Sequence, residues 1–355
     1  MLEINCRTKV KRLNLTSKSR CFIIQCKKYY SEVEMRFCYA FRRFSDYPYL
    51  GIATDLDPTK LTDKFLKRVN NMGFDGIELG MECLERVEGR EKGLKEFEKR
   101  LSDFGTPVLA IRSGGRWGGS MVDPKTGEEN IIRAKGAIKF GSILKSEVIN
   151  GATCEPEKSP YIDTGSGLVS GLEFAHHGFP FSQNSSRQTT LPEYDMLAEK
   201  YQELCDEAKN YGLNISCEMH QNSPIDNSWS AKLLHSKVER DNFGINPDLG
   251  NIIWNYDIPE ELTEDAIKEL APISNYWHCK NMTRVNHPEN QRSVFIRENI
   301  LGGEIDYRFA IEAMHDGKYK GLMALEGVPS GDQFYSDKQS LDYCKEIWED
   351  VENNS

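Results

Sequence analysis

The sequence lacks several features that would place it in a special class of protein. It contains no run of eighteen consecutive apolar residues, so we expect no membrane-spanning helix and no membrane partner. Its ten cysteines include no C-x-x-C pair, which argues against a zinc ribbon and indicates reduced thiols in a cytoplasmic protein. With 39% hydrophobic and 28% charged residues, it also lacks the compositional biases of collagen, coiled coils or disordered chains. What remains is a globular chain with enough apolar residues for a large core.

The charge of the chain is unevenly distributed. The net charge is −10, and such an acidic surface repels a phosphate backbone, so we expect no nucleic-acid partner. Residues 1–34 hold eight basic and three acidic residues, a balance of +5 that leaves −15 on residues 35–355. We interpret residues 1–34 as a basic, disordered N-terminal extension. A targeting segment, or an extension upstream of a natural start at Met35, are the alternatives.

Short apolar runs alternate with amphipathic stretches from about residue 50 onward. The apolar runs predict a first strand within Met35–Thr54 and seven more at Gly76–Gly80, Pro107–Ser113, Ser146–Ala152, Asn214–His220, Phe243–Asp248, Asn275–Lys280 and Gly321–Glu326. The amphipathic stretches predict helices at Asp57–Met72, Gly93–Phe104, Asn130–Leu144, Leu191–Tyr211, Ser228–Val238, Thr263–Leu270, Asp306–His315 and Asp332–Val351. No G-x-G-x-x-G motif follows the first strand, which disfavours a dinucleotide-binding sheet. We therefore predict an α/β chain in which residues 35–355 form a single (β/α)₈ TIM barrel.

Three long polar segments rich in Gly, Pro, Ser and Asn interrupt this alternation. They are Ser113–Glu129, Thr153–Pro192 and Thr283–Ile305, and each follows a predicted strand and precedes a predicted helix. Such segments lie on the C-terminal face of a barrel, where barrel enzymes keep their active sites. We predict that they are enlarged irregular loops with a lid or binding role.

Four successive predicted strands end in a side chain that can bind a metal ion. These side chains are Glu218, Asp248, His278 and Glu326. Because side chains alternate along a strand, Cys217 on one face leaves Glu218 on the other, directed into the barrel. The same alternation directs His278 and Glu326 inward, so all four can converge at the barrel mouth.

Three carboxylates and one imidazole around a single point repel one another unless a cation neutralises them. A set of oxygen ligands with one imidazole suits Mn²⁺, Mg²⁺ or Co²⁺ better than a thiolate-type zinc site. We predict one divalent metal ion held by these four residues, with Mn²⁺ expected first.

These residues resemble the sugar phosphate isomerase/epimerase family, a group within the xylose isomerase-like TIM barrels that includes ketose 3-epimerases and inosose dehydratases. The resemblance covers roughly Met35 to Val351. It is carried by the four candidate ligands and by Gly76–Leu79, Asn246–Asn251, His278–Asn281 and Leu325–Gly327. It implies a barrel with one divalent ion, and in the epimerase branch Glu218 and Glu326 would also shuttle protons.

The resemblance also concerns positions around the ligands. Arg284, six residues after His278, matches a substrate-contacting arginine of the epimerase branch. Two positions depart from that branch, because Asn251 replaces a histidine and Pro224 replaces a second glutamate. We keep Asn251 among the candidate substrate-binding residues, and the departures leave the type of epimerase open.

Further candidates for substrate contact follow from their positions. Lys280, directed inward, would neutralise a developing oxyanion or pair with a carboxylate inside the barrel. His220 would bind a substrate hydroxyl or orient a neighbouring ligand. On the long loops, the pair His176 and His177 lies among phenylalanines and would form an aromatic wall with a mobile base, or only loop packing. Two more candidate sugar contacts lie in a glycine cluster, namely Arg116 and Trp117.

The sequence thus leaves three functions open. The first is an isomerase or epimerase that abstracts a proton next to a carbonyl of a sugar or keto-sugar, through a metal-stabilised enediolate. The second is a lyase, of dehydratase or C-glycoside-cleaving type, acting on an oxidised sugar through the same enediolate. The third is a non-catalytic sugar-binding protein. The expected partner is a small sugar or glycoside-derived molecule, and the resemblance to the family implies a homo-oligomer or a small partner subunit.

Overall fold

The computed structural model describes residues 35–41, 57–113, 121–122, 127–152, 172–174, 186–220, 223–253, 261–287, 292–327 and 331–354. All of them belong to one compact unit, Met35–Ser355. The predicted extension at residues 1–34 lies outside the described residues, and so do four candidate substrate contacts, Arg116, Trp117, His176 and His177.

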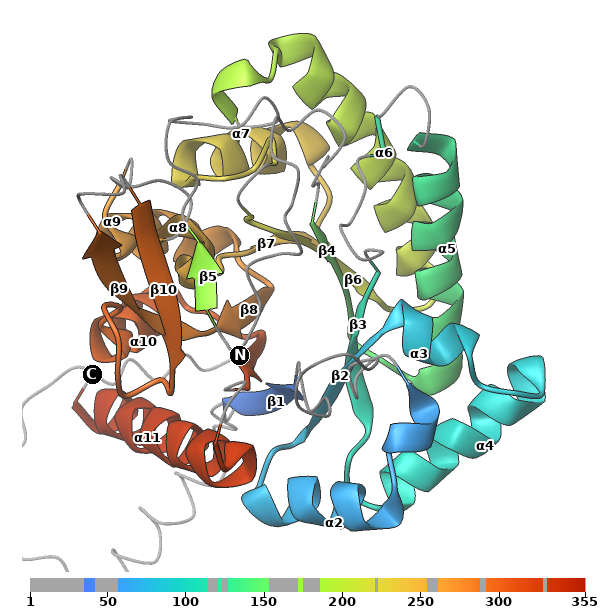
Figure 1. The fold of residues 1–355 in the computed structure, drawn as a ribbon. Coiled ribbons are helices and arrows are strands. Elements are labelled where there is room, and N and C mark those ends of the chain that lie inside the picture. The colour runs from blue at the N-terminus through green and yellow to red at the C-terminus, as the bar shows by residue number, and fades with distance from the viewer. Residues whose placement is uncertain are drawn as a thin grey trace, which may run out of the picture. The chain divides into compact units, whose positions relative to one another are not determined.

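Eight parallel strands form a nearly closed barrel (Figure 1). The strands are β1 (Arg36–Ala40), β2 (Gly76–Gly80), β3 (Val108–Arg112), β4 (Val148–Ala152), β6 (Asn214–Glu218), β7 (Phe243–Asn246), β8 (Tyr276–Cys279) and β11 (Leu322–Glu326). They pair in the order β7-β6-β4-β3-β2-β1-β11-β8. The two end strands meet where the Asn275 backbone N–H donates to the Ile245 carbonyl oxygen at 3.3 Å. The predicted (β/α)₈ TIM barrel is confirmed.

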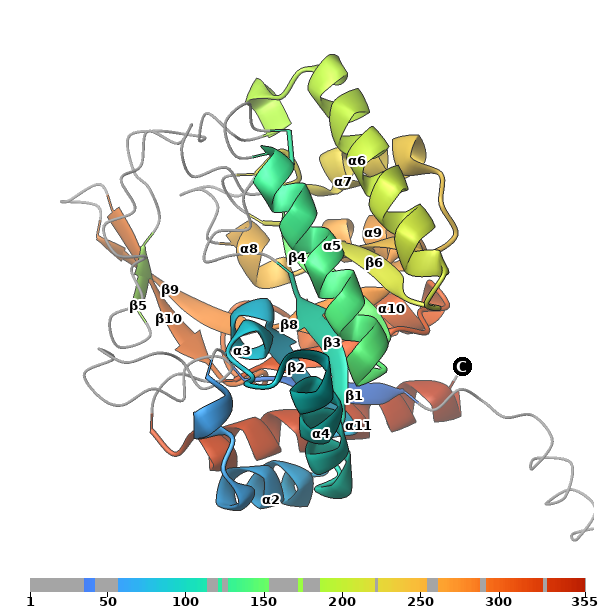
Figure 2. The same ribbon diagram turned by 90° about the vertical axis from the view of Figure 1, so that its right-hand side faces the viewer.

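Helices wrap the outside of the barrel (Figure 2). They are α2 (Asp63–Met72), α3 (Met81–Glu85), α4 (Arg90–Asp103), α5 (Gly127–Leu144), α6 (Leu191–Lys209), α7 (Ser228–Val238), α8 (Leu249–Ile253), α9 (Thr263–Leu270), α10 (Tyr307–Asp316) and α11 (Gln333–Asn354), with short 3-10 turns η2 (Pro58–Lys60), η4 (Ser186–Gln188) and η5 (Ala271–Ile273). Side-chain caps begin several of them: Thr62 accepts from the Phe65 N–H, and Asp306 accepts from the Phe309 N–H. Helix α2 ends at Gly73, whose φ of +92° suits glycine.

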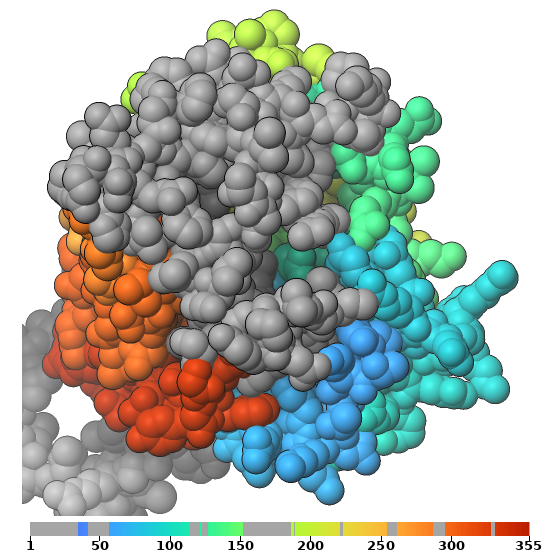
Figure 3. All heavy atoms as spheres, in the orientation of Figure 1, coloured from blue at the N-terminus to red at the C-terminus, as the bar shows by residue number. Residues whose placement is uncertain are grey.

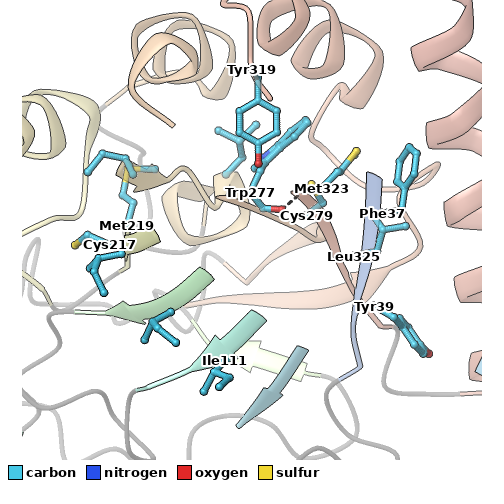
Figure 4. Packing of buried hydrophobic residues seen from close by; sticks show 14 of the residues in the cluster. Phe37, Tyr39, Ile111, Cys217, Met219, Trp277, Cys279, Tyr319, Met323 and Leu325 are labelled. Carbon is cyan, nitrogen blue, oxygen red and sulfur yellow. Dashed lines mark hydrogen bonds between the residues drawn. The ribbon is translucent and has the colours of Figure 1, made fainter. Parts of the chain in front are cut away.

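The outward faces of the strands pack against these helices in a continuous apolar layer (Figure 4). In β6 and β11 the outward side chains include Cys217, Met323 and Leu325, and Met219 directly after β6 joins the same layer. A second, smaller cluster that includes Cys38, Ala40, Ala110, Ala324 and Tyr276 shares none of those residues. This alternation follows the predicted phase and leaves Glu218 and Glu326 on the face opposite the helices.

A three-stranded antiparallel sheet adds to the barrel. It joins β9 (Asn281–His287) and β10 (Arg292–Glu298), which follow β8, to β5 (Leu172–Phe174), in the order β5-β10-β9. The sheet projects from one end of the barrel in Figure 2, and in Figure 3 the atoms of β9 and β10 (orange) lie across the viewed face from α2–α4. The prediction of an irregular loop over Thr283–Ile305 is therefore wrong. Many of its residues belong to the antiparallel strands β9 and β10, which pair with each other, and β10 also pairs with β5 from an earlier part of the chain.

The expectation of reduced thiols agrees with the described cysteines. Six cysteines are described, and all are free and buried: Cys38, Cys83, Cys205, Cys217, Cys279 and Cys344. Burial raises the pKa of the Cys217 thiol to about 12, so it stays protonated at neutral pH. Within the described part of the chain, no helix has both the length and the apolar character needed to cross a bilayer.

Candidate metal centre

The four side chains predicted to share one ion meet at the C-terminal ends of neighbouring strands. Glu218 ends β6, His278 lies in β8, Glu326 ends β11, and Asp248 follows β7 by two residues. One ligand atom of each residue lies within 4.8 Å of the corresponding atoms of the other three, and all four residues are buried. Strand ends in one barrel layer thus bring residues more than a hundred positions apart into a single cluster.

The electrostatics of Asp248 fit a bound cation. Burial raises the pKa of this carboxyl to about 6; the Lys280 ammonium opposes the shift, and the Glu326 and Glu218 carboxylates add to it. Asp248 Oδ1 accepts a hydrogen bond from the Gly250 N–H, while Oδ2 is buried and pairs with Lys280 Nζ at 2.7 Å. A divalent ion at this point would remove the repulsion between the carboxylates. The donor set of three carboxylates and one imidazole therefore suits a hard divalent ion.

The orientation of His278 also fits a metal ligand. Its Nε2 lies 2.7 Å from Glu78 Oε2, an oxygen that also accepts a hydrogen bond from the Tyr276 hydroxyl at 2.8 Å. An ionised carboxylate only accepts, so the Nε2 atom carries the proton and Nδ1 keeps its lone pair. Nδ1 faces Glu218 at 3.4 Å and Glu326 at 3.5 Å. This tautomer directs the imidazole lone pair into the cluster.

Sequence reasoning assigned no role to Glu78. The signal was present in β2, because Ile77 and Leu79 belong to the layer that faces the helices and Glu78 between them must face inward. A buried inward-facing acid on a strand requires a partner. Only the fold shows that this partner is His278, two hundred residues away along the chain.

We expect Glu78→Gln to weaken Mn²⁺ binding by about 10- to 100-fold, because a glutamine can donate to Nε2 and then no longer enforces the tautomer in which Nδ1 is unprotonated. Titration calorimetry of the purified variant measures the affinity. Glu147→Gln, which alters a half-exposed carboxylate paired with Arg36, serves as the control and should bind Mn²⁺ like the parent chain. Unchanged affinity in Glu78→Gln would show that His278 orients independently of Glu78.

Lys280 lies inside the cluster. Its Nζ is 2.7 Å from Asp248 Oδ2, 3.7 Å from Glu326 Oε2, and donates to Asn251 Oδ1 at 2.7 Å. Of the two roles considered for Lys280, these contacts support that of a carboxylate partner. The side chain fits because position 250 is glycine: a Cβ there would lie 2.5 Å from Lys280 Cγ. Asn251 in turn donates to Glu218 Oε1 at 3.2 Å, so it touches a candidate ligand.

An arginine that sequence reasoning did not identify contributes to the site. Arg297 in β10 is buried, and its Nη2 lies 2.9 Å from Glu326 Oε2. The predicted Arg284 lies in β9, where its Nη2 donates to the Ile253 carbonyl at 2.7 Å and its guanidinium lies over the Phe295 ring. The three-stranded sheet thus places the Arg297 guanidinium beside Glu326. No local pattern in the sequence predicts this position of Arg297.

The structure places one more predicted substrate contact. His220 follows β6 and is half-buried, and its backbone N–H donates to the Ile225 carbonyl at 2.8 Å. Its contact with substrate stays a prediction, as do those of Lys280, Arg284 and Asn251. The four residues outside the described part of the chain stay predictions in the same way.

A family comparison matches residues 66–346, about four-fifths of the chain, to the xylose isomerase-like TIM barrel. The chain belongs to this family. None of the curated proteins compared with the chain matches it. The four-residue cluster described above is therefore a feature of a xylose isomerase-like barrel, and it lies at the mouth where such barrels bind their ligands.

Solved structures share the fold of this xylose isomerase-like barrel. A xylose isomerase-like TIM barrel protein from Mycobacterium smegmatis in complex with magnesium is 22% identical, with a TM-score of 0.67 over 90% of this chain and 98% of that one. An L-ribulose 3-epimerase is 15% identical, with a TM-score of 0.63 over 90% and 96%. A probable 3-DHS dehydratase from Bacillus anthracis is 15% identical, with a TM-score of 0.58 over 87% and 99%. At these identities the likeness shows the fold.

Proposed function

We propose that the chain is a divalent-metal-dependent isomerase or epimerase that acts on a sugar or keto-sugar by removing a proton next to a carbonyl. One observation carries this proposal: two buried glutamates, Glu218 and Glu326, reach the same four-residue cluster from different strands. Binding alone does not require a pair of bases, whereas moving a proton between two positions of a substrate does. The similarity in fold to an L-ribulose 3-epimerase supports the same class.

In the proposed reaction the residues bind the ion, transfer protons or hold a ligand in place. Glu218, Asp248, His278 and Glu326 would hold the ion, which when bound polarises the substrate carbonyl and stabilises negative charge on oxygen. One of the two glutamates accepts the proton from the carbon, and the C–H electron pair moves into an enediolate. The other glutamate donates a proton to the opposite face or to the neighbouring carbon. Lys280 keeps Asp248 in place while the charge moves.

A lyase is the second candidate, and one structural feature favours it. The β5-β10-β9 sheet lies beside the four-residue cluster, since Arg297 of β10 contacts Glu326, and this extension of the barrel suits a substrate larger than a simple hexose. A carbanion formed by the same glutamates can expel water or an aglycone from the adjacent carbon instead of taking a proton back. The shared fold of the probable 3-DHS dehydratase is compatible with this outcome.

Incubation of the metal-loaded protein with a panel of keto-sugars and oxidised glycosides in deuterated buffer tests the proposal. We expect deuterium at the carbon next to the carbonyl together with interconversion of two sugars, detected by mass spectrometry and NMR. Release of water or an aglycone would instead identify the lyase. A protein that binds panel sugars and exchanges no proton would be a sugar-binding protein. The variant with both Glu218 and Glu326 changed to glutamine controls for background exchange.

A further inference from the structure

We infer that Asn246 and Asn150 form a one-directional chain of amides that positions Glu218, which makes both asparagines positioning residues for the metal centre. This inference rests on the metal-dependent function proposed above. It concerns the hydrogen bonds behind the ligands, on the side of Glu218 that faces β4 and β7.

The chain begins at a group that can only donate. The His278 backbone N–H donates to Asn246 Oδ1 at 2.7 Å, so the amide oxygen of Asn246 must face His278. The Nδ2 of Asn246 therefore faces the other way and donates to Asn150 Oδ1 at 3.2 Å. This contact in turn directs Asn150 Nδ2 toward Glu218 Oε2, to which it donates at 3.1 Å. The first donor thus determines the orientation of every later group.

Burial prevents either amide from reversing. Asn150 and Asn246 are both 0% exposed, and Glu218 is 4% exposed. Asn150 lies in β4, Glu218 in β6 and Asn246 in β7, three adjacent strands in which Glu218 is the direct register partner of Asn246. A flipped amide would set oxygen against oxygen and N–H against N–H where water does not reach. The two asparagines therefore hold one conformation.

The second oxygen of Glu218 is oriented from the opposite side. Lys280 Nζ donates to Asn251 Oδ1, and an ammonium cannot accept, so Asn251 Nδ2 faces Glu218 Oε1 at 3.2 Å. Both Glu218 oxygens thus accept an N–H from a neutral amide whose orientation is imposed elsewhere. Glu326 differs, because its Oε2 faces the cations Arg297 at 2.9 Å and Lys280 at 3.7 Å.

These hydrogen bonds orient the Glu218 carboxylate toward the other candidate ligands. A carboxylate oxygen can accept more than one contact, so an amide N–H that bonds to it orients the oxygen without excluding a metal ion. Glu218 Oε2, which accepts from Asn150, lies 3.4 Å from His278 Nδ1, the imidazole atom directed at the same point. The amide chain thus connects the backbone of one ligand, His278, to the side chain of another, Glu218.

Mn²⁺ affinities of single and double variants test the chain, measured by titration calorimetry without any substrate. We expect Asn150→Ala and Asn246→Ala each to weaken Mn²⁺ binding by about 10- to 100-fold. If the effect of Asn246 passes through Asn150, then Asn246→Ala lowers the Mn²⁺ affinity by a smaller factor in the Asn150→Ala background than in the parent chain. We expect the two factors to differ by about threefold or more. Glu78→Gln acts through the imidazole and not through the amides. In the double variant Glu78→Gln/Asn150→Ala, the loss of Mn²⁺ affinity should therefore equal the product of the losses in the two single variants.

The control is Asn275→Ala. Asn275 is an asparagine of the same barrel whose Nδ2 donates to the Ile215 carbonyl, and we expect its loss to affect stability and leave Mn²⁺ affinity unchanged. Serine variants at positions 150 and 246 give the same comparison if an alanine variant does not fold. Unchanged affinity in the Asn150 variant, or effects of positions 150 and 246 that multiply, would overturn the amide chain alone. A parent chain that binds no Mn²⁺ would overturn the proposed function together with this inference.

Discussion

Changing Glu218 or Glu326 to glutamine is expected to lower turnover by about 10²- to 10⁴-fold, the usual contribution of a positioned acid or base. Glutamine keeps an oxygen for the ion and nearly the same shape, but it does not accept a proton from carbon. The two glutamates stand in different surroundings, with amides around Glu218 and Arg297 beside Glu326. Loss of either should therefore stop the transfer at a different stage, and both variants should lose net interconversion.

Two measurements separate this effect from a loss of the ion. Turnover is measured at saturating Mn²⁺, and the Mn²⁺ affinity of each variant is determined independently. Solvent deuterium exchange without product formation in one variant would identify the remaining glutamate as the base that acts first. A variant with near-parental turnover would exclude that glutamate from proton transfer.

Removal of the ion should have the second largest effect. We expect chelation to abolish activity and Mn²⁺ to restore it, since three carboxylates and an imidazole lie within 4.8 Å of one another. When free ion is held at about one hundred times its dissociation constant, binding stabilises the fold by about 2.7 kcal/mol. Chelation should then lower the melting temperature by roughly 3–5 °C, as measured by calorimetry.

Two variants make the chelation experiment specific. Asp248→Asn removes one ligand and one buried negative charge, so we expect its melting temperature to respond much less to Mn²⁺ or chelator. Asp337→Asn changes another buried aspartate, which bonds to the Tyr39 hydroxyl, and should respond like the parent chain. Full activity of the exhaustively chelated parent protein would contradict a role for the ion.

The barrel and its four candidate ligands were accessible from the sequence because both depend on local patterns. Alternation within Asn214–Glu218 is enough to direct Glu218 inward, and the apolar run before Glu326 does the same for that residue. The helices Ser228–Val238 and Thr263–Leu270 match their predicted bounds because each has an apolar stripe and distinct ends.

The residues behind the ligands were not predictable in this way. Alternation shows that Glu78 faces inward, but it does not show that the partner is His278. Asn246 begins one of the segments that carry the family resemblance, but neither that segment nor the strand around Asn150 shows what the two amides contact, and their roles emerge only from strand order. Arg297 was missed for a further reason, because the polar segment that contains it was interpreted as a loop.

The position of β10 in the middle of its sheet has a consequence for shortening the chain. Residues Leu172–Phe174 of β5 cover one side of β10 by pairing with Val294, Phe295 and Ile296. A deletion that removes β5 would leave a row of unsatisfied backbone donors and acceptors along β10, which is a template for pairing with a neighbouring molecule. Trimmed versions of this protein should therefore aggregate through that bare edge unless a proline or a charged residue is introduced there.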